Sequence, residues 1–258
     1  MKISHAAGHA LSTAGKETPC GMKEWSFSSV VATYVMDDLN EYEGVEQRRF
    51  DDVTGKVDIP LNDRSDRINV WGADVHLDYH ANAFGTGGWN SANGIETYIH
   101  PSHSKESFQL AKLIQDNLIK ATGLSNRGVK KANFHMLRET DISAKASSNR
   151  KRNVVKASAL LEMGFMTNQR EAELLKSDGF RRKCAKAIVD SLVFLYGLKK
   201  KEVVQVANAN ENQADKFAVE AQKWVIENKI SDGTRPRDPV TRQEQWVMMW
   251  RAAGSPKV

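Results

Sequence analysis

The chain has 258 residues and a formal charge of +5 at pH 7; 40% of its residues are apolar and 27% are charged. This length suits one sizeable domain or a domain with a small module, and no run of about 18 apolar residues exists, which excludes a membrane-spanning helix. The positive charge favours an anionic partner, but no stripe interleaves basic with aromatic residues, so we do not expect nucleic acid.

Strand patterns alternate with amphipathic helix patterns through most of the chain. We expect strands at residues 2–6, 45–51, 73–80, 95–100, 134–137 and 157–164. We expect helices at residues 24–43, 62–72, 105–122, 169–177 and 179–196. Because alternating strands and helices form parallel sheets covered by helices, the sequence predicts an α/β fold with a mainly parallel, twisted sheet flanked by helices.

The composition shifts near the C-terminal end toward lysine, asparagine and small residues. We expect a linker at 198–213, between a domain at 1–197 and a small all-helical module at 214–258. Within this module we predict helices at 214–228 and 241–253.

The N-terminus and the cysteines indicate where the protein is made. The first residues enter a predicted strand without the apolar stretch of a signal peptide, so we expect synthesis in the cytoplasm. Cys20 and Cys184 lie far apart in the sequence, and we expect two free thiols. Neither cysteine has Cys-x-x-Cys spacing, which argues against a thiolate zinc site.

Four polar residues stand out in short strand-like or loop contexts: His9, Glu24, His80 and Glu162. Two imidazoles and one carboxylate are the ligand set of a catalytic zinc, which keeps a fourth position for water. A further carboxylate off the metal provides the proton acceptor that such a water needs. The set therefore predicts a zinc hydrolase.

His76 and His80 are four residues apart, a spacing that binds zinc when it lies on a helix. Residues 73–80 are a predicted strand instead, and on a strand this spacing separates two residues by about 13 Å. Because zinc–ligand bonds are about 2 Å long, only one of the two histidines can be a ligand. We expect the other, His76, to be buried or hydrogen-bonded.

Glu162 lies in the apolar run 157–163, which is predicted to be an interior strand. A buried, unpaired carboxylate is costly, so Glu162 needs a partner. Two partners fit, a structural arginine or a zinc-bound water. Glu96, on its own predicted strand between Ile95 and Thr97, is the competing carboxylate.

Five short motifs occur in a characteristic order: Gly8-His9, Glu24, His80-Ala81-Asn82-Ala83, Gly94-Ile95-Glu96-Thr97 and Glu162-Met163-Gly164-Phe165-Met166-Thr167-Asn168. Over about residues 1–197 the chain resembles the zinc-dependent N-acetylmuramoyl-L-alanine amidases of bacterial autolysins and phage endolysins. The resemblance implies that His9, Glu24 and His80 bind Zn²⁺ and that Glu162 is the catalytic base. For Glu96 it implies a role in supporting the metal ligands without binding the metal, or in orienting the substrate. The remaining histidines are expected to be structural or at the surface: His5, His100, His103 and His135.

The resemblance implies hydrolysis of the amide bond between N-acetylmuramic acid and L-alanine in peptidoglycan. A phage endolysin that reaches the wall after lysis or holin-mediated release is the leading expectation. A host autolysin of the mother cell would share this chemistry, whereas a zinc peptidase would cut the stem peptide. An inert wall-binding protein is the non-enzymatic alternative, which the intact ligand set disfavours.

Two further segments carry expectations. The turn around Ile230-Ser231-Asp232-Gly233-Thr234 and the start Thr241-Arg242 resemble one S-layer homology repeat, which implies binding to anionic wall polymers. A hairpin that stabilises the chain or forms a weak homodimer is the alternative. Residues 142–156 depart from the family pattern as a polar insertion. We expect an exposed loop there that either borders the substrate groove or is merely solvated.

Overall fold

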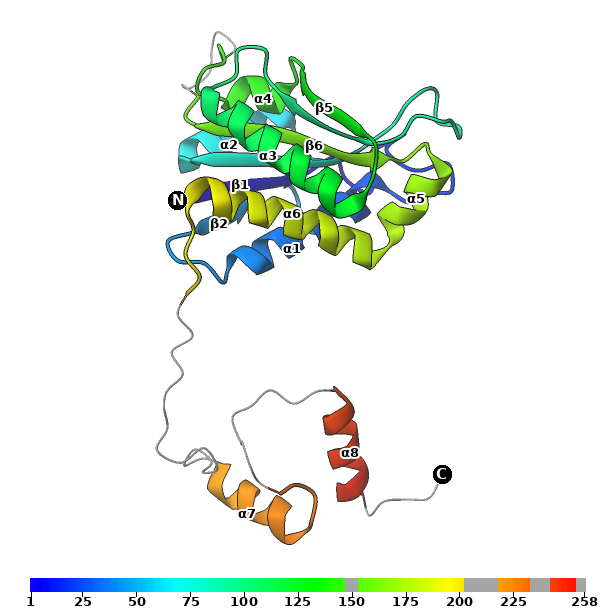
Figure 1. Ribbon diagram of the computed structural model, residues 1–258, viewed down its shortest axis with the longest axis vertical. Coiled ribbons are helices and arrows are strands. Elements are labelled where there is room, and N and C mark those ends of the chain that lie inside the picture. Colours follow the sequence, from blue (N-terminus) through cyan, green and yellow to red (C-terminus); the bar gives the residue numbers. More distant parts are fainter. Residues whose placement is uncertain (147–152, 202–217, 233–241, 254–258) are drawn as a thin grey trace. The chain divides into compact units, whose positions relative to one another are not determined.

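The computed structural model describes residues 1–146, 153–201, 218–232 and 242–253. The chain divides into two compact units, Met1–Lys201 and Glu202–Val258. Each unit is described by itself (Figure 1).

The larger unit alternates strands and helices. Its strands are β1 (Lys2–Ala7), β2 (Glu46–Arg49), β3 (Val75–Asn82), β4 (Ile95–Ile99), β5 (Asn126–Lys131) and β6 (Ala157–Phe165). Its helices are α1 (Glu24–Leu39), α2 (Leu61–Trp71), α3 (Lys105–Thr122), α4 (His135–Thr140), α5 (Gln169–Lys176) and α6 (Asp178–Tyr196).

The strands form one six-stranded sheet in the order β2-β1-β3-β6-β4-β5. Neighbouring strands are parallel, except that β4 runs antiparallel to β6. The predicted α/β fold with a mainly parallel sheet is therefore confirmed. In this arrangement the carboxyl ends of β1, β3 and β6 lie side by side, which is where parallel sheets place their ligand sites.

Helices cover both faces of the sheet (Figure 1). Helices α1, α3 and α6 pack together and against the strands to form the main hydrophobic core, whereas α2 and α4 pack on each other around a smaller one. Because side chains alternate along a strand, Leu77 and Tyr79 face the main core. Asp78, His80 and Glu162 line a cavity beside α2 and α4 on the other face.

One predicted strand is wrong, and one real strand is absent from the prediction. Residues 134–137 are the N-cap and the first residues of helix α4. Within this helix the Thr140 hydroxyl donates to the Met136 carbonyl at 2.6 Å. An apolar run this short does not distinguish a strand from a buried helix. Strand β5 has the sequence Asn-Arg-Gly-Val-Lys-Lys and pairs only with β4. As an edge strand it needs no apolar face, so it has no strand pattern.

The smaller unit contains α7 (Val219–Glu227) and α8 (Arg242–Ala252), so its described part is helical as expected. The Arg251 guanidinium donates to the carbonyl of Ile230, just after α7, at 3.1 Å. Most of the predicted linker 198–213, and the turn at 233–241, lie outside the described residues. None of the described helices has the length and apolar character that crossing a membrane requires.

The described ends of the insertion 142–156 are exposed in part, as expected, and anchored in part. Ile142 is 43% exposed, and Ser143, Lys145 and Lys156 are also exposed. Asn153 is 3% exposed, and its amide donates to the carbonyls of Arg138, Asp141 and Ala144. Val155 is fully buried. The middle of the insertion, 147–152, lies outside the described residues, so the predicted loop is not tested there.

Candidate active site

The loop after β1 places His9 beside the end of β3. The backbone of His9 has φ 63°, an uncommon conformation for a residue with a side chain. Gly8 donates its backbone N–H to the Tyr79 carbonyl at 2.8 Å. A Cβ atom on Gly8 would lie 2.3 Å from ring atoms of His80, so only glycine permits this approach.

Glu24 is the first residue of α1 and is 2% exposed. Its Oε1 accepts hydrogen bonds from His80 Nδ1 at 2.8 Å and from the Ala81 N–H at 3.2 Å. Its Oε2 lies 3.5 Å from His9 Nε2. Helix α1 thus delivers a buried carboxylate to the two imidazoles.

The structure brings His9, Glu24 and His80 together as a cluster able to hold a metal ion. One ligand atom from each lies within 4.8 Å of the others. Zinc bonds of about 2.1 Å in a tetrahedron place ligand atoms about 3.4 Å apart, and the two distances from Glu24 lie on either side of this value. The other ring nitrogen of His80, Nε2, lies 3.4 Å from Asp78 Oδ1. A carboxylate behind a metal-binding histidine is the usual outer-shell arrangement of zinc sites.

The charges of the cluster suit a cation. Burial lowers the pKa of His9 to about 4, which leaves its imidazole neutral and able to bind a metal. Burial opposes ionisation of Glu24, but the hydrogen bond and charge of His80 lower its pKa overall. Burial likewise opposes charge on His80, yet Asp78 and Glu24 raise its pKa well above the usual value. Without a metal, a proton on His80 therefore stands in for part of the cation's charge, and metal binding would release it.

Glu162 lies on β6 directly opposite His80 in the strand register. Its side chain is half-buried, and its Oε2 is fully buried without a hydrogen-bond partner. Burial raises the pKa of Glu162 to about 8; His80 lowers it, and the Glu24 and Glu96 carboxylates raise it. A buried carboxyl with a free oxygen and a pKa near neutrality has the properties of a general base.

These groups share one cavity of about 590 Å³. Its wall includes His9, His80, Asp78 and Glu162 together with apolar residues from the start of α2 and from α4. A volume of this size accommodates a small-molecule-sized part of a substrate. Glu162 and two of the three candidate metal ligands, His9 and His80, therefore border the same space.

A match to the N-acetylmuramoyl-L-alanine amidase family spans residues 6–193, which include the cluster and Glu162. The chain belongs to this family. It shares 30% of residues with the N-acetylmuramoyl-L-alanine amidase CwlM of Bacillus licheniformis over 86% of its own length and 81% of that protein. The corresponding values for the sporulation-specific amidase of Bacillus subtilis strain 168 are 31%, 78% and 70%.

Two further proteins extend the comparison. The endolysin of Bacillus phage SPP1 is 30% identical over 67% of this chain and 57% of the phage protein. The catalytic domain of the amidase CwlV from Bacillus (Paenibacillus) polymyxa var. colistinus has a TM-score of 0.64 at 25% identity. The match covers 77% of this chain and all of that domain. The family match and these relatives support peptidoglycan amidase activity for this chain.

In this amidase Glu96 lies next to Glu162, opposite it in the antiparallel register of β4 and β6. Its carboxylate is fully engaged: Asn82 and Tyr98 donate to Oε1 at 2.6 and 2.7 Å, while Arg127, at 2.6 Å, and Lys130 donate to Oε2. Burial alone would raise the pKa of Glu96, but these contacts, of which the one from Lys130 has the largest effect, lower it to about 2. Of the two neighbouring carboxyls, only Glu162 has a free oxygen.

The other histidines of the amidase stay outside the metal cluster. His76 is fully buried and bonded to the Ser4 hydroxyl at 3.0 Å, which confirms its predicted structural character. His5 bonds to Tyr79 and Gln47. His135 lies 3.3 Å from the Ser65 hydroxyl, in keeping with a structural role, and it also lines the cavity. Cys20 and Cys184 are free thiols, as predicted.

Sequence reasoning missed four charged residues of the cavity wall: Lys16, Asp58, Arg64 and Asp78. The Lys16 charge is close enough to affect His9, Glu24 and Glu162. Lys16 lies in the loop between two motifs, and nothing in its local sequence marks it. For Asp78 a signal existed, because a charged residue two positions from His80 shares its face of the strand.

We expect Gly8→Ala to abolish zinc binding by the amidase, because the added methyl group would occupy the space of the His80 ring. Metal content after dialysis against zinc measures this effect. Gly15→Ala is the matched control for loss of a loop glycine, since a Cβ there meets no atom within 4 Å. Its left-handed backbone makes the control variant somewhat less stable but leaves zinc binding intact. Full zinc occupancy in Gly8→Ala would contradict the close approach.

We expect Glu162→Gln to stabilise the metal-free amidase at neutral and alkaline pH. The pKa of Glu162 rises from 4.5 to about 8 on folding, so the folded state binds the extra proton and stability falls as pH rises between these values. Each unit corresponds to about 1.4 kcal/mol, which makes the total fall a few kcal/mol.

Denaturant unfolding of both metal-free proteins at pH 5, 7 and 9 tests this expectation. The advantage of Glu162→Gln should grow with pH and level off above about pH 8. A constant difference between the two proteins across the series would contradict the raised pKa.

Proposed function

We propose that this amidase is zinc-dependent and hydrolyses the amide bond between N-acetylmuramic acid and L-alanine in peptidoglycan. The observation that carries the proposal is that His9 and His80, which cluster with Glu24, line one cavity together with Glu162, whose Oε2 has no partner. Family membership supports the choice of bond.

In this proposal His9, Glu24 and His80 hold Zn²⁺, which when bound supplies a Lewis acid and a water of lowered pKa. Asp78 lies 3.4 Å from Nε2 of His80, the ring nitrogen that does not contact Glu24, and keeps that imidazole oriented. Glu162 accepts a proton from the attacking water while the oxygen of that water bonds to the amide carbonyl carbon. When the carbon–nitrogen bond breaks, Glu162 returns this proton to the leaving amine of L-alanine.

We also propose that the biological setting is phage-induced lysis, with the protein acting as an endolysin released to the wall by lysis or a holin. Similarity to the SPP1 endolysin supports this setting. Similarity to the sporulation-specific amidase supports the alternative, a host autolysin of the mother cell. A neighbouring holin gene in a prophage would favour the first and a sporulation-controlled promoter the second.

For the smaller unit we propose attachment to anionic wall polymers, in line with its resemblance to an S-layer homology repeat. Trp224 is 53% exposed on α7 and Met249 is 64% exposed on α8, so apolar side chains are available for contact. Cosedimentation of the full chain and of residues 1–201 with purified walls tests this role. Equal binding, together with dimers seen only for the full chain, would favour the dimer alternative.

Mass spectrometry of peptidoglycan digested by the full chain tests the proposed bond specificity. We expect new free N-termini on L-alanine alongside uncut glycan strands. New amines elsewhere in the stem would indicate a zinc peptidase, and an absence of products would favour a wall-binding role.

A further inference from the structure

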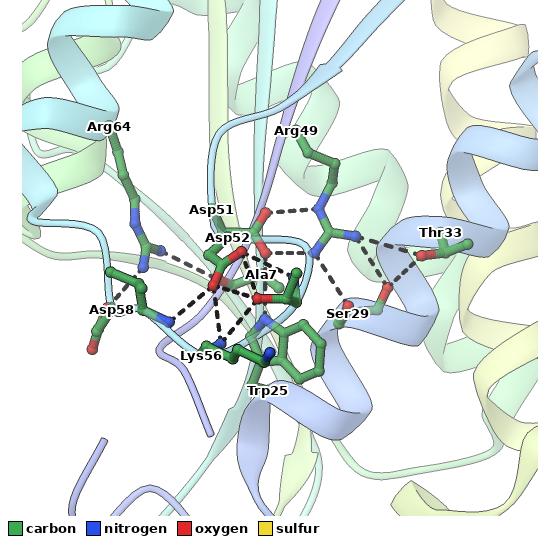
Figure 2. Close-up of polar contacts among 12 residues, drawn as sticks. Ala7, Trp25, Ser29, Thr33, Arg49, Asp51, Asp52, Lys56, Asp58 and Arg64 are labelled. Carbon is green, nitrogen blue, oxygen red and sulfur yellow. Dashed lines mark hydrogen bonds and ion pairs between the residues drawn. The ribbon is translucent and has the colours of Figure 1, made fainter. Parts of the chain in front are cut away.

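Arg64, on α2, is 2% exposed and is among the largest fully buried side chains. Figure 2 shows its guanidinium reaching Asp58 and Ala7. It donates to the Asp58 carboxylate at 2.7 Å, to the Ala7 carbonyl at 3.1 Å and to the Ile59 carbonyl at 2.9 Å. Ala7 is the last residue of β1, two positions before His9.

Asp58 continues the connection to the far side of His9. Its second oxygen accepts from the Thr13 hydroxyl at 2.6 Å, and the oxygen of that hydroxyl accepts from the Ala10 N–H at 2.9 Å. One chain of contacts therefore holds the backbone on both sides of His9.

The segment that carries Asp58 is itself held firmly. The Asp52 carboxylate accepts from the Lys56 N–H at 2.9 Å (Figure 2). It also accepts from the N–H groups of Thr54 and Val57 at 3.0 and 2.9 Å. The hydrogen bond from the Thr54 N–H has the largest effect on the pKa of Asp52. Together with the bonds from the Thr54 hydroxyl and from the N–H groups of Val57 and Lys56, it lowers this pKa to about 2. From this segment the Gly55 carbonyl accepts the Leu11 N–H at 2.9 Å.

We propose that Arg64, Asp58 and Thr13 are positioning residues that hold the His9 loop in its left-handed conformation, ready for the metal, without binding the metal themselves. His9 at φ 63° is unfavourable for a residue with a side chain, so surrounding contacts must hold it in place. Without these contacts the loop would be ordered only when metal binds, and the entropy lost would weaken the affinity. This inference rests on the proposed zinc site.

Thr13 allows an effect of loop position on zinc affinity to be separated from an effect of charge. Arg64 and Asp58 form an ion pair, and Thr13 is neutral, so Thr13→Val changes no charge near the metal. Valine matches the shape of threonine but neither accepts the Ala10 N–H nor donates to Asp58. Any loss of zinc affinity in Thr13→Val is therefore an effect of loop geometry.

The test measures zinc affinity of the full chain by competition with a chromophoric chelator, together with the melting temperature of the metal-free protein. We expect Thr13→Val to weaken zinc binding by about tenfold, the lower end of the range for outer-shell partners. Thr13→Ser, which keeps the hydroxyl, should restore the affinity. Ser12→Ala is the matched control, because its exposed hydroxyl makes only a 3.4 Å contact to the Lys56 carbonyl.

Asp58→Asn is expected to act through the same contacts, so its effect and that of Thr13→Val should be less than additive in the double variant. Unchanged zinc affinity in Thr13→Val, or an equal loss in Thr13→Ser, would overturn the proposal. So would a loss of affinity that merely follows a fall in metal-free melting temperature, because that indicates general destabilisation.

Failure of the proposed function is separately visible. A wild-type chain that binds no zinc would refute the zinc site and leave the loop to be tested on its own. In the metal-free protein, hydrogen exchange of the Ala10 amide should be slow in the wild type and in Thr13→Ser but fast in Thr13→Val. Equal exchange in all three would refute the positioning role.

Discussion

We expect Glu162→Gln to lower the turnover of peptidoglycan by about 10²- to 10⁴-fold while zinc stays bound. Glutamine keeps the shape of the side chain but can neither accept the proton of the attacking water nor return it to the leaving amine. Because Glu162 is not one of the three clustered ligand residues, metal content should equal that of the wild type. Initial rates on purified walls, measured beside zinc content, provide both readouts.

Glu96→Gln is the matched control for this substitution, since Glu96 is the neighbouring carboxylate in the register. Its oxygens are occupied by four donors, so we expect lower stability and a much smaller loss of turnover. A Glu162→Gln protein with near wild-type turnover would contradict the assignment of the base. Equal losses in the two variants would show that neither carboxyl has a distinct role.

The second large effect is expected for Glu24→Gln, which should weaken zinc binding by more than the roughly 10- to 100-fold cost of losing an outer-shell partner. The substitution removes the only carboxylate among the three clustered groups. The amide oxygen of glutamine can still accept from His80 Nδ1, which lies 2.8 Å from Glu24 Oε1, so the substitution removes the negative charge while that contact can remain. Zinc content after dialysis and the rate on walls should fall together.

Glu17→Gln is the control for Glu24→Gln. Glu17 lies in the same segment, but its carboxylate is 39% exposed and pairs with Lys23 at 2.7 Å. Exposed pairs of this kind contribute little, so zinc content and activity should stay at wild-type levels. A Glu24→Gln protein that keeps full zinc would remove Glu24 from the ligand set.

The sequence was sufficient for features that depend on local pattern. The apolar periodicity of α3 predicts its bounds, Lys105–Thr122, and the alternation of strands with helices predicts a mainly parallel sheet. The motifs around His9, Glu24 and His80 predict residues that the fold brings within 4.8 Å. Such features are readable because each depends on neighbours a few residues away.

Features that depend on distant contacts were not predictable. Arg64 acts on Ala7 across 57 positions, and no local pattern distinguishes it from a surface arginine of an amphipathic helix. Edge strand β5 takes its conformation from pairing with β4 rather than from its own composition. The raised pKa of Glu162 follows from its burial in the folded protein. The sequence indicates this burial only through the apolar run that contains Glu162.

The measurement that tests the central claim most directly is digestion of purified peptidoglycan by the full chain before chelation, after chelation and after zinc is restored. The predicted result is release of stem peptides with free L-alanine N-termini, lost on chelation and regained with zinc. Undiminished release of these products by protein shown to contain no metal would contradict a zinc-dependent amidase built on His9, Glu24, His80 and Glu162.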